Sequence, residues 1–300
     1  MTLGFDLSAV LVWQLASAAA AWCLGASRAL WLRRMGVAFA VMGALTGFVA
    51  YATFLRWLMG LLGGFSAMRA WALLREPYKA TWFARYGYLV GVADLRAVPR
   101  TAGVFAPKLF LRALGFLPLS LLGAAMARAA ALNPGLGHWG AGLRVVGGAL
   151  LIYCATEVLE PTLRGLYALA GFQIARMHED PIVSRTLGEW WGQRWNRVVG
   201  RWLRDQCFTP MARRRRARLG LVLSFAVSAL YHAWFTLAAI GVEGAARMGA
   251  FFVVQGALVM AESALRVGRW PRAAQHTWTL GWLLVTSPLF TAPLLRVMGL

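Results

Sequence analysis

The sequence predicts an all-α protein that crosses a membrane several times. Of its 300 residues, 60% are hydrophobic and only 14% are charged, and 15 are tryptophans. Such a composition is typical of polytopic membrane proteins rather than soluble ones. The apolar residues are also gathered into stretches of about twenty, the length that a helix needs to cross a ~30 Å hydrocarbon layer.

About seven stretches, with six to nine as the range, are expected to span the membrane. In chain order they cover residues 7–25, 35–55, 109–132, 140–159, 219–240, 248–265 and 277–298. Asp6 and the absence of a basic residue before the first stretch are unlike a secretory signal, so it is interpreted as a permanent helix. The apolar patches at 57–65 and 166–174 are too short to span. No repeat, low-complexity tract or linker is visible, so we expect one domain over residues 1–300.

The basic residues are distributed unevenly along the chain. The net charge is +20, and most of the 31 Lys and Arg residues fall in regions 56–112, 164–218 and 266–272. With seven spans these regions share one side, and a Lys/Arg excess marks the cytoplasmic side. We therefore expect an integral protein of a bacterial-type cytoplasmic membrane, with the N-terminus inside and the C-terminus outside. No basic domain stands apart from the apolar stretches, so membrane lipids rather than nucleic acid are the expected partner.

A histidine lies inside the apolar stretch 219–240. Ser224, Ser228, His232 and Thr236 recur at every fourth position, which places them on one slowly turning stripe of a helix. Polar and ionisable groups at membrane depth normally face another helix or a water-filled cavity. His232 is therefore a candidate functional residue. The alternative is a structural histidine bonded to a neighbouring helix.

The stretch GEWWGQRWNRVVGRWLRD precedes this histidine and is predicted to be an amphipathic helix at the membrane surface. A helical wheel separates two sets, one mainly of tryptophan and one of arginine: Trp191, Trp195, Val198, Val199 and Trp202, and Arg194, Arg197, Arg201 and Arg204. Tryptophans suit the headgroup level, and arginines can bind lipid phosphates or an anionic ligand such as a nucleotide. Asn196 is expected on neither stripe, beside Gly192.

The same residues carry a resemblance to a known family. The run PIVSRTLGEWWGQRWN at 181–196, then RWLRD at 201–205 and SALYH at 228–232, resembles the membrane-bound O-acyltransferase (MBOAT) superfamily, and most closely its wax-synthase branch. The resemblance implies helices of the MBOAT type with short interfacial helices that enclose a catalytic cavity reached from the cytoplasm. It also implies that His232 is catalytic and that Asn196 is the polar residue beside the tryptophan. Ala233 follows His232, where many relatives carry an acidic residue.

The implied reaction moves a fatty acyl group from acyl-CoA to the hydroxyl of a lipophilic alcohol. A neutral imidazole at His232 is suited to removing the alcohol proton, and Asn196 or a serine hydroxyl could donate to the oxyanion. Asn196 could instead orient the histidine, line the acyl-CoA entrance or cap a loop. We expect substrate contacts from Trp191, Arg194, Trp195, Arg201 and Ser228. Acyl-CoA is the donor substrate, and no other cofactor and no metal is expected.

Other chemistries and roles are less well supported by the residues. The sequence contains no Gly-x-Ser-x-Gly elbow, Walker loop, dinucleotide fingerprint or metal-ligand spacing. The cluster His178-Glu179-Asp180 is expected to be solvated rather than catalytic. Glu157 and Glu262 are either partners between helices or cavity residues. A transporter with His232 and Glu262 in a polar pathway is the main alternative function, although two related halves are not visible.

Overall fold

The computed structural model describes residues 2–77, 79–92, 98 and 100–300, and these are predominantly helical. Short 3-10 and π-helical turns join the α-helices, and an isolated bridge pairs Arg100 with Phe172. The expected all-α class is confirmed. Asp94, Arg96 and Pro99, which belong to the Lys/Arg-rich region 56–112, lie outside the described residues.

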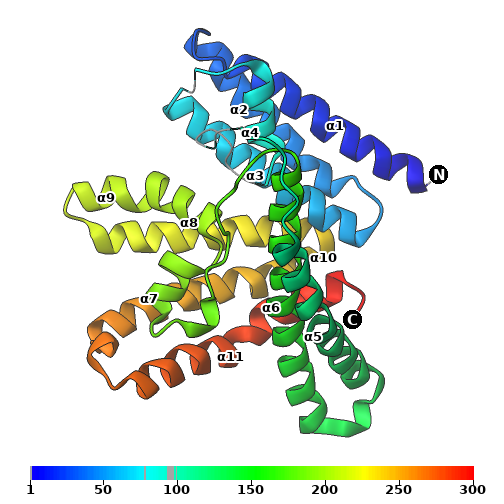
Figure 1. Ribbon diagram of the computed structural model, residues 1–300, viewed down its shortest axis with the longest axis vertical. Helices are drawn as coiled ribbons and strands as arrows, with labels where there is room; N and C mark the ends of the chain where they lie inside the picture. The colour runs from blue at the N-terminus through cyan, green and yellow to red at the C-terminus, as the bar shows by residue number, and fades with distance from the viewer. Residues whose placement is uncertain (1, 78, 93–97, 99) are drawn as a thin grey trace. The chain divides into compact units, whose positions relative to one another are not determined.

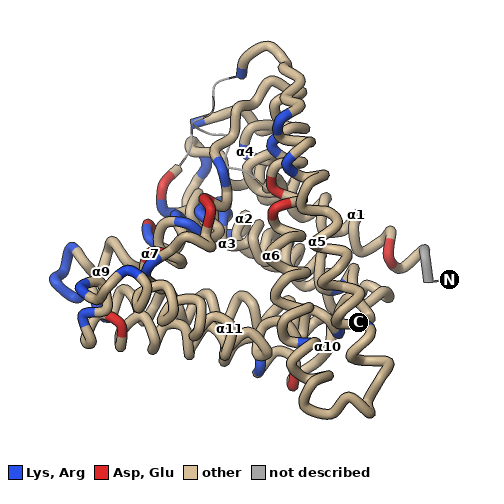
Figure 2. Tube along the Cα trace, turned by 60° about the horizontal axis from the view of Figure 1, so that its bottom comes forward, with Lys and Arg blue, Asp and Glu red and all other residues tan. Residues whose placement is uncertain are grey.

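Within the described part of the chain, six helices are long and apolar enough to cross a membrane. They are α1 (Thr2–Cys23), α3 (Thr53–Arg75), α5 (Pro107–Leu132), α6 (Gly137–Leu169), α10 (Ala217–Ala264) and α11 (Arg272–Val297). Figure 2 shows Lys and Arg gathered around α9 and near α7, whereas α5, α6 and α11 carry few charges along most of their length. This arrangement is the one expected of a polytopic membrane protein.

The second predicted span is wrong in position. Residues 35–55 are divided between α2 (Leu30–Ala44), which has 15 residues, a 3-10 turn (Leu45–Phe48) and the start of α3. The helix that is long and apolar enough to span is instead α3, which contains the patch at 57–65 and continues past Arg69. That arginine is 2% exposed and donates to the carbonyls of Tyr88, Gly91 and Val92. A charge bonded in this way need not end an apolar helix.

The contacts divide the chain into two compact units, and residues 1–97 with 230–249 make up the first. In it α2 packs against α1 and α3, and α4 (Trp82–Val90) packs against α1 and α3 (Figure 1). Its core combines alanines with a few larger side chains such as Leu24, Leu73 and Leu89. The small residues allow the helices to approach closely, as is common in membrane bundles.

Residues 98–229 and 250–300 make up the second unit. Its α5 and α6 form an antiparallel hairpin joined by the turn Pro134–Leu136, and α11 packs on α6 (Figure 1). The short helices α7 (Leu187–Glu189), α8 (Arg197–Leu203) and α9 (Thr209–Arg213) follow the hairpin. Because α10 contributes residues to both units, this division does not test the single-domain prediction.

The 48-residue helix α10 is broken at Gly241, whose φ is 81° and ψ is −171°. Only glycine readily adopts that conformation. The break falls between the two predicted spans 219–240 and 248–265, and the segments on either side of it are each long enough to cross a bilayer. The sequence therefore separated these two apolar stretches at the correct place.

We expect Gly241→Ala to destabilise the protein by about 1–3 kcal/mol, because the new Cβ forces a left-handed conformation on an ordinary residue. No heavy atom lies within 4 Å of that Cβ, so crowding does not contribute. Thermal unfolding in detergent measures the effect. Gly281→Ala is the matched control, since it also meets nothing within 4 Å but lies inside α11. Equal melting temperatures for the two variants would contradict the prediction.

Candidate functional site

The tryptophan-rich segment of the second unit begins with a capped helix. Thr186 is the N-cap of α7, and its Oγ1 accepts from the N–H of Glu189 at 2.9 Å. The Glu189 carboxylate accepts from the N–H of Arg185 at 2.8 Å. The pair resembles a capping box, in which side chains satisfy the first N–H groups of a helix.

Glu262 of α10 holds the same helix start from the other side. Its buried carboxylate accepts from the N–H groups of Leu187 at 2.6 Å and Gly188 at 3.1 Å. Glu262 is thus a partner between segments, which is one of the two roles expected for it. The Glu262 carboxylate therefore bonds the backbone at the start of α7, which accounts for its burial without the polar pathway of the transporter alternative.

The segment is not the single amphipathic helix that the sequence predicts. Residues Trp190–Arg194 form a π-helix, Trp195 is extended, and Asn196 is left-handed with φ 40° and ψ 61° before α8 begins. The prediction fails because asparagine tolerates the left-handed region and readily caps helices, so the chain breaks where the periodicity continues. The two stripes of the helical wheel therefore do not extend across residues 195–196. π-Helical turns are frequent at functional sites.

Asn196 occupies the N-cap of α8. Its Oδ1 accepts from the N–H of Val199 at 3.3 Å, and the residue is half-buried. Capping was one of the roles left open by the sequence, and the geometry shows that Asn196 performs it. An amide side chain has two donors besides the acceptor. Capping through Oδ1 therefore leaves Nδ2 able to donate to a ligand.

Three tryptophans form the apolar part of this segment. Trp190 is buried and stacks on Trp195, with ring centroids 5.5 Å apart and an interplanar angle of 15°. The Trp191 ring lies 6.5 Å from that of Trp195, and its Nε1 donates to Oε1 of the fully buried Gln255 at 3.0 Å. Gln255 in turn donates to Thr286 of α11 at 2.8 Å. The structure thus brings Trp191 and Trp195 together and adds Trp190, which sequence analysis missed.

The predicted ligand-binding arginines differ in their surroundings. Arg194 donates to the Glu189 carboxylate at 2.7 Å and to the carbonyl of Glu179 at 3.0 Å. Burial alone would raise the pKa of Glu189, but the hydrogen bonds from Arg185 and Arg194 hold that pKa below its usual range. Arg201 is exposed on α8. Arg194 therefore stabilises the segment, whereas Arg201 is accessible to an anionic ligand.

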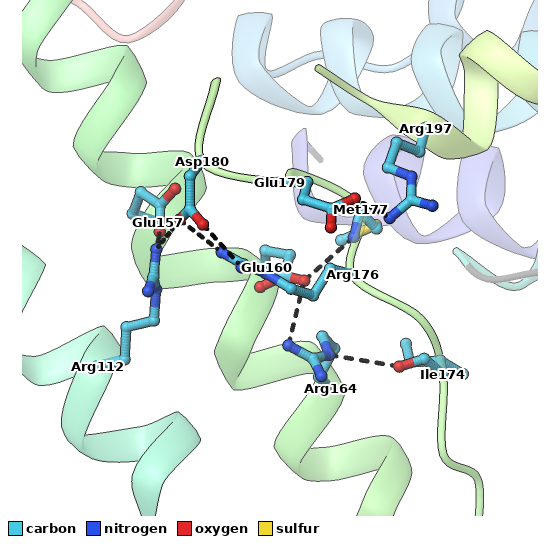
Figure 3. A network of polar contacts seen from close by, with 10 residues as sticks. All are labelled: Arg112, Glu157, Glu160, Arg164, Ile174, Arg176, Met177, Glu179, Asp180 and Arg197. Carbon is cyan, nitrogen blue, oxygen red and sulfur yellow. Dashed lines mark hydrogen bonds and ion pairs between the residues drawn. The ribbon is translucent and has the colours of Figure 1, made fainter. Parts of the chain in front are cut away.

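The carboxylates of the cluster His178-Glu179-Asp180 are partly solvated, as expected, with the side chains of Glu179 and Asp180 49% and 45% exposed, but they also form ion pairs. Asp180 pairs with Arg176 at 2.9 Å and with Arg112 at 3.2 Å, and Glu179 pairs with Arg197 (Figure 3). The hydrogen bond from Arg176 holds the pKa of Asp180 below its usual range. These carboxylates are therefore also structural partners of arginines, two of which, Arg112 and Arg197, are distant in sequence.

His178 packs its ring edge-to-face on Trp195, with centroids 4.7 Å apart. Burial, reinforced by the positive charge of Arg176, lowers the pKa of His178 to about 4. An imidazole with that pKa is neutral at physiological pH and contributes no charge beside the tryptophans.

This low pKa predicts a pH dependence of stability. An unfolded histidine binds a proton below about pH 6.5, whereas folded His178 does so only below about pH 4. The unfolded state therefore binds more protons between these values, and stability falls as the pH is lowered, by at most about 1.4 kcal/mol per pH unit. His178→Phe keeps an aromatic ring and removes the titration. The melting temperature of this variant minus that of the wild type should increase as the pH is lowered from 6.5 to 4.5. A difference that stays constant over this range would contradict the prediction.

His232 lies in the first unit, on α10. Its ring contacts those of Tyr231 and Phe235 edge-to-face, at 5.3 and 5.2 Å between centroids, and its carbonyl accepts from the Thr236 hydroxyl at 2.8 Å. Ser228 and Thr236 are buried, and Ser224 bonds the carbonyl of Gly220. The predicted stripe therefore lies on one continuous helix.

The helical turn that carries His232 is fixed by contacts with α3. The Tyr231 hydroxyl donates to the carbonyl of Leu61 at 2.8 Å. A Cβ added to Gly60 would lie 2.9 Å from Cβ of Phe235, and one added to Gly64 would lie 2.9 Å from Cε2 of Tyr231. Such distances require one side to move, so the two helices are as close as their backbones allow.

The candidate residues are thus divided between the two units. Trp191, Arg194, Trp195, Asn196 and Arg201 belong to the second unit, as does Ser228, which precedes His232 by one helical turn on α10. His232 belongs to the first. That His232 and Asn196 act on one substrate stays a prediction.

Comparison with known proteins adds a family match to this geometry. The sequence model of the membrane bound O-acyl transferase family matches residues 175–254. Among similar proteins of Arabidopsis thaliana, probable long-chain-alcohol O-fatty-acyltransferase 3 is 28% identical over 171 residues, covering 51% of this chain and 50% of the relative. Acyl-CoA–sterol O-acyltransferase 1 is 26% identical over 152 residues, covering 46% and 44%. The chain spans about half the length of the relatives it matches.

Proposed function

Because the chain belongs to the membrane-bound O-acyltransferase superfamily, we propose that it transfers a fatty acyl group from acyl-CoA to the hydroxyl of a lipophilic alcohol. The observation that carries the proposal is the matched region itself. Residues 175–254 contain both the Trp190–Asn196 segment and His232. The relatives are named for the acylation of long-chain alcohols and a sterol, which supports a lipophilic alcohol as the proposed acceptor.

His232 is the proposed general base. Its neutral imidazole takes the proton as the alcohol oxygen attacks the thioester carbonyl, and the proton then passes to the departing CoA sulfur. The new ester bond replaces the thioester bond, so the products are an ester and free CoA. The oxyanion requires a donor, which Nδ2 of Asn196 or the Ser228 hydroxyl would supply.

The acyl-CoA phosphates are proposed to bind the arginines near Asn196. Arg201 is exposed on α8, one turn after Asn196, and a guanidinium binds phosphate through two parallel hydrogen bonds. Trp191 and Trp195 would contact the apolar part of the donor. Arg201→Ala is expected to raise KM for acyl-CoA with little change in kcat, whereas Arg194→Ala should also disturb the segment because Arg194 bonds Glu189 and Glu179.

Release of the CoA thiol tests the function. Purified protein in detergent should release free thiol only when acyl-CoA and an alcohol are both present, and the ester should appear in equal amount. Long-chain alcohols, a sterol and diacylglycerol are the acceptors to compare, with acetyl, medium-chain and long-chain donors. Folded protein that releases no thiol with any of these pairs would overturn the proposal.

The active site is proposed to be reached from the cytoplasm, on the side of the arginine-rich loops. Single cysteines introduced at Ala80, Arg185 and Leu300 into a variant with its three native cysteines replaced report which side each position faces. In intact cells an impermeant thiol reagent should label only the Leu300 position. Labelling at Arg185 would reverse the orientation and with it the access of cytoplasmic acyl-CoA.

A further inference from the structure

We propose that Glu160 is a positioning residue for Asn196, acting through the backbone of Met177. Residues 174–180, here called the strap, lie between α6 and the Trp195–Asn196 turn, and hydrogen bonds connect them to both. The inference rests on the proposed function for its catalytic consequence. The structural link it describes can be measured without any activity.

The first link joins the strap to α6. The Glu160 side chain is buried, and its Oε1 accepts from the N–H of Met177 at 3.1 Å (Figure 3). Arg164, one turn later on α6, lies 3.7 Å from the same oxygen and donates to the carbonyl of Ile174 at 3.3 Å. A buried carboxylate is tolerated when it is paired and hydrogen-bonded. Of the two partners of Glu160, Met177 belongs to the strap, and Arg164 bonds the strap at Ile174.

The second link joins the strap to the turn that contains Asn196. The carbonyl of Met177 accepts from the N–H of Arg197 at 2.8 Å, and the N–H of Glu179 donates to the carbonyl of Arg194 at 2.9 Å. These two bonds lie on either side of Trp195 and Asn196. Met177 therefore receives one bond from the turn and gives one to Glu160, so the position of the carboxylate sets the position of the turn.

This double fixation matters because Asn196 is left-handed, with φ 40°. A residue in that conformation persists when its surroundings determine it from both sides. The amide must also be held precisely, since a misplacement of about 1 Å can lower a rate by about a hundredfold. Glu160 supplies an anchor for the turn on the spanning helix α6, through Met177.

The kinetic test compares two substitutions at Glu160. Glu160→Gln keeps an oxygen that accepts from Met177, whereas Glu160→Met has a similar volume and no such acceptor. We expect Glu160→Met to lower kcat by about tenfold to a hundredfold with little change in KM, and Glu160→Gln to retain most of the activity. In the double variant that combines Glu160→Met with Asn196→Asp, the decrease in kcat should be smaller than the two single decreases combined, because both substitutions affect the Asn196 amide. Additive losses, or equal losses for both Glu160 variants, would overturn the proposal.

Glu157→Met is the matched control. Glu157 is an equally buried carboxylate one turn earlier on α6. It pairs with Arg112, which also bonds Asp180 of the strap, so this control keeps a connection to the strap but does not involve the N–H of Met177. Its replacement should lower stability without the selective loss of kcat. A loss of kcat equal to that of Glu160→Met would show a general effect of removing a buried carboxylate, and would overturn the assignment to Glu160.

Amide hydrogen exchange tests the link independently of catalysis. In the wild type the N–H groups of Met177 and Arg197 should both be protected, and free exchange of either one would overturn the inference even if Glu160→Met does not fold. Glu160→Met should increase exchange at both, and Glu160→Gln at neither. Absence of acyl transfer in the wild type would remove the proposed function while this exchange pattern remained, so the two failures are distinguishable.

Discussion

His232→Ala is expected to lower the turnover of the folded protein by about two to four orders of magnitude, which is the usual contribution of a positioned base. Binding of acyl-CoA should be retained, because the arginines proposed to bind its phosphates lie on a different segment. Turnover per folded molecule and acyl-CoA affinity are the two measurements. Ser224→Ala is the matched control, since it removes another polar group from the same stripe of α10 and should leave turnover unchanged.

A structural histidine would behave differently. Loss of a buried hydrogen bond costs roughly 1–3 kcal/mol of stability, so the His232→Ala protein would be obtained in low yield while its folded fraction remained active. A well-folded His232→Ala enzyme with more than about a tenth of wild-type turnover would remove the catalytic assignment.

Asn196→Asp is expected to reduce turnover by about a hundredfold to a thousandfold, the usual effect of losing an oxyanion donor, with stability close to that of the wild type. The aspartate keeps an oxygen for the N–H of Val199 and is a favoured N-cap, so the start of α8 is preserved. It lacks the Nδ2 donor and adds a negative charge where charge would develop. The measurements are turnover and melting temperature.

Asn196→Gly removes the side-chain cap and keeps the left-handed backbone conformation. Glycine adopts φ 40° without strain and costs only a few tenths of a kcal/mol at an N-cap, so the protein should fold and lose turnover to a similar degree. Asn196→Ala adds strain and is the less informative change. If Asn196→Asp were as active as the wild type, the amide would be a cap only, and Ser228 would become the candidate oxyanion donor.

The sequence predicted those features that depend on composition and local periodicity. The number and class of apolar helices, the polar stripe through His232 and the separation of two stretches near Gly241 agree with the structure. Each rests on residues that are close together in the chain. The second span failed for the opposite reason, because the hydrogen bonds that satisfy Arg69 come from residues about twenty positions later.

The candidate site was predicted as residue types and not as geometry. The periodicity of tryptophans and arginines continues through Asn196, so the wheel could not show that the backbone turns left-handed there. An asparagine followed three residues later by a helical N–H that it can cap was the available signal. The supports of the segment could not be found in this way, since Gln255 and Glu262 bond residues more than sixty positions away.

The close approach of α3 and α10 has a consequence for the tolerance of this protein to mutation. At Gly60 and Gly64 even a methyl group meets the neighbouring helix at 2.9 Å, whereas at Gly115 and Gly142 it meets nothing within 4 Å. In a library with every substitution at each glycine, the first two positions should accept almost no replacement and the last two should accept many. The close packing of α3, which carries no proposed catalytic group, is thus expected to restrict sequence variation by itself.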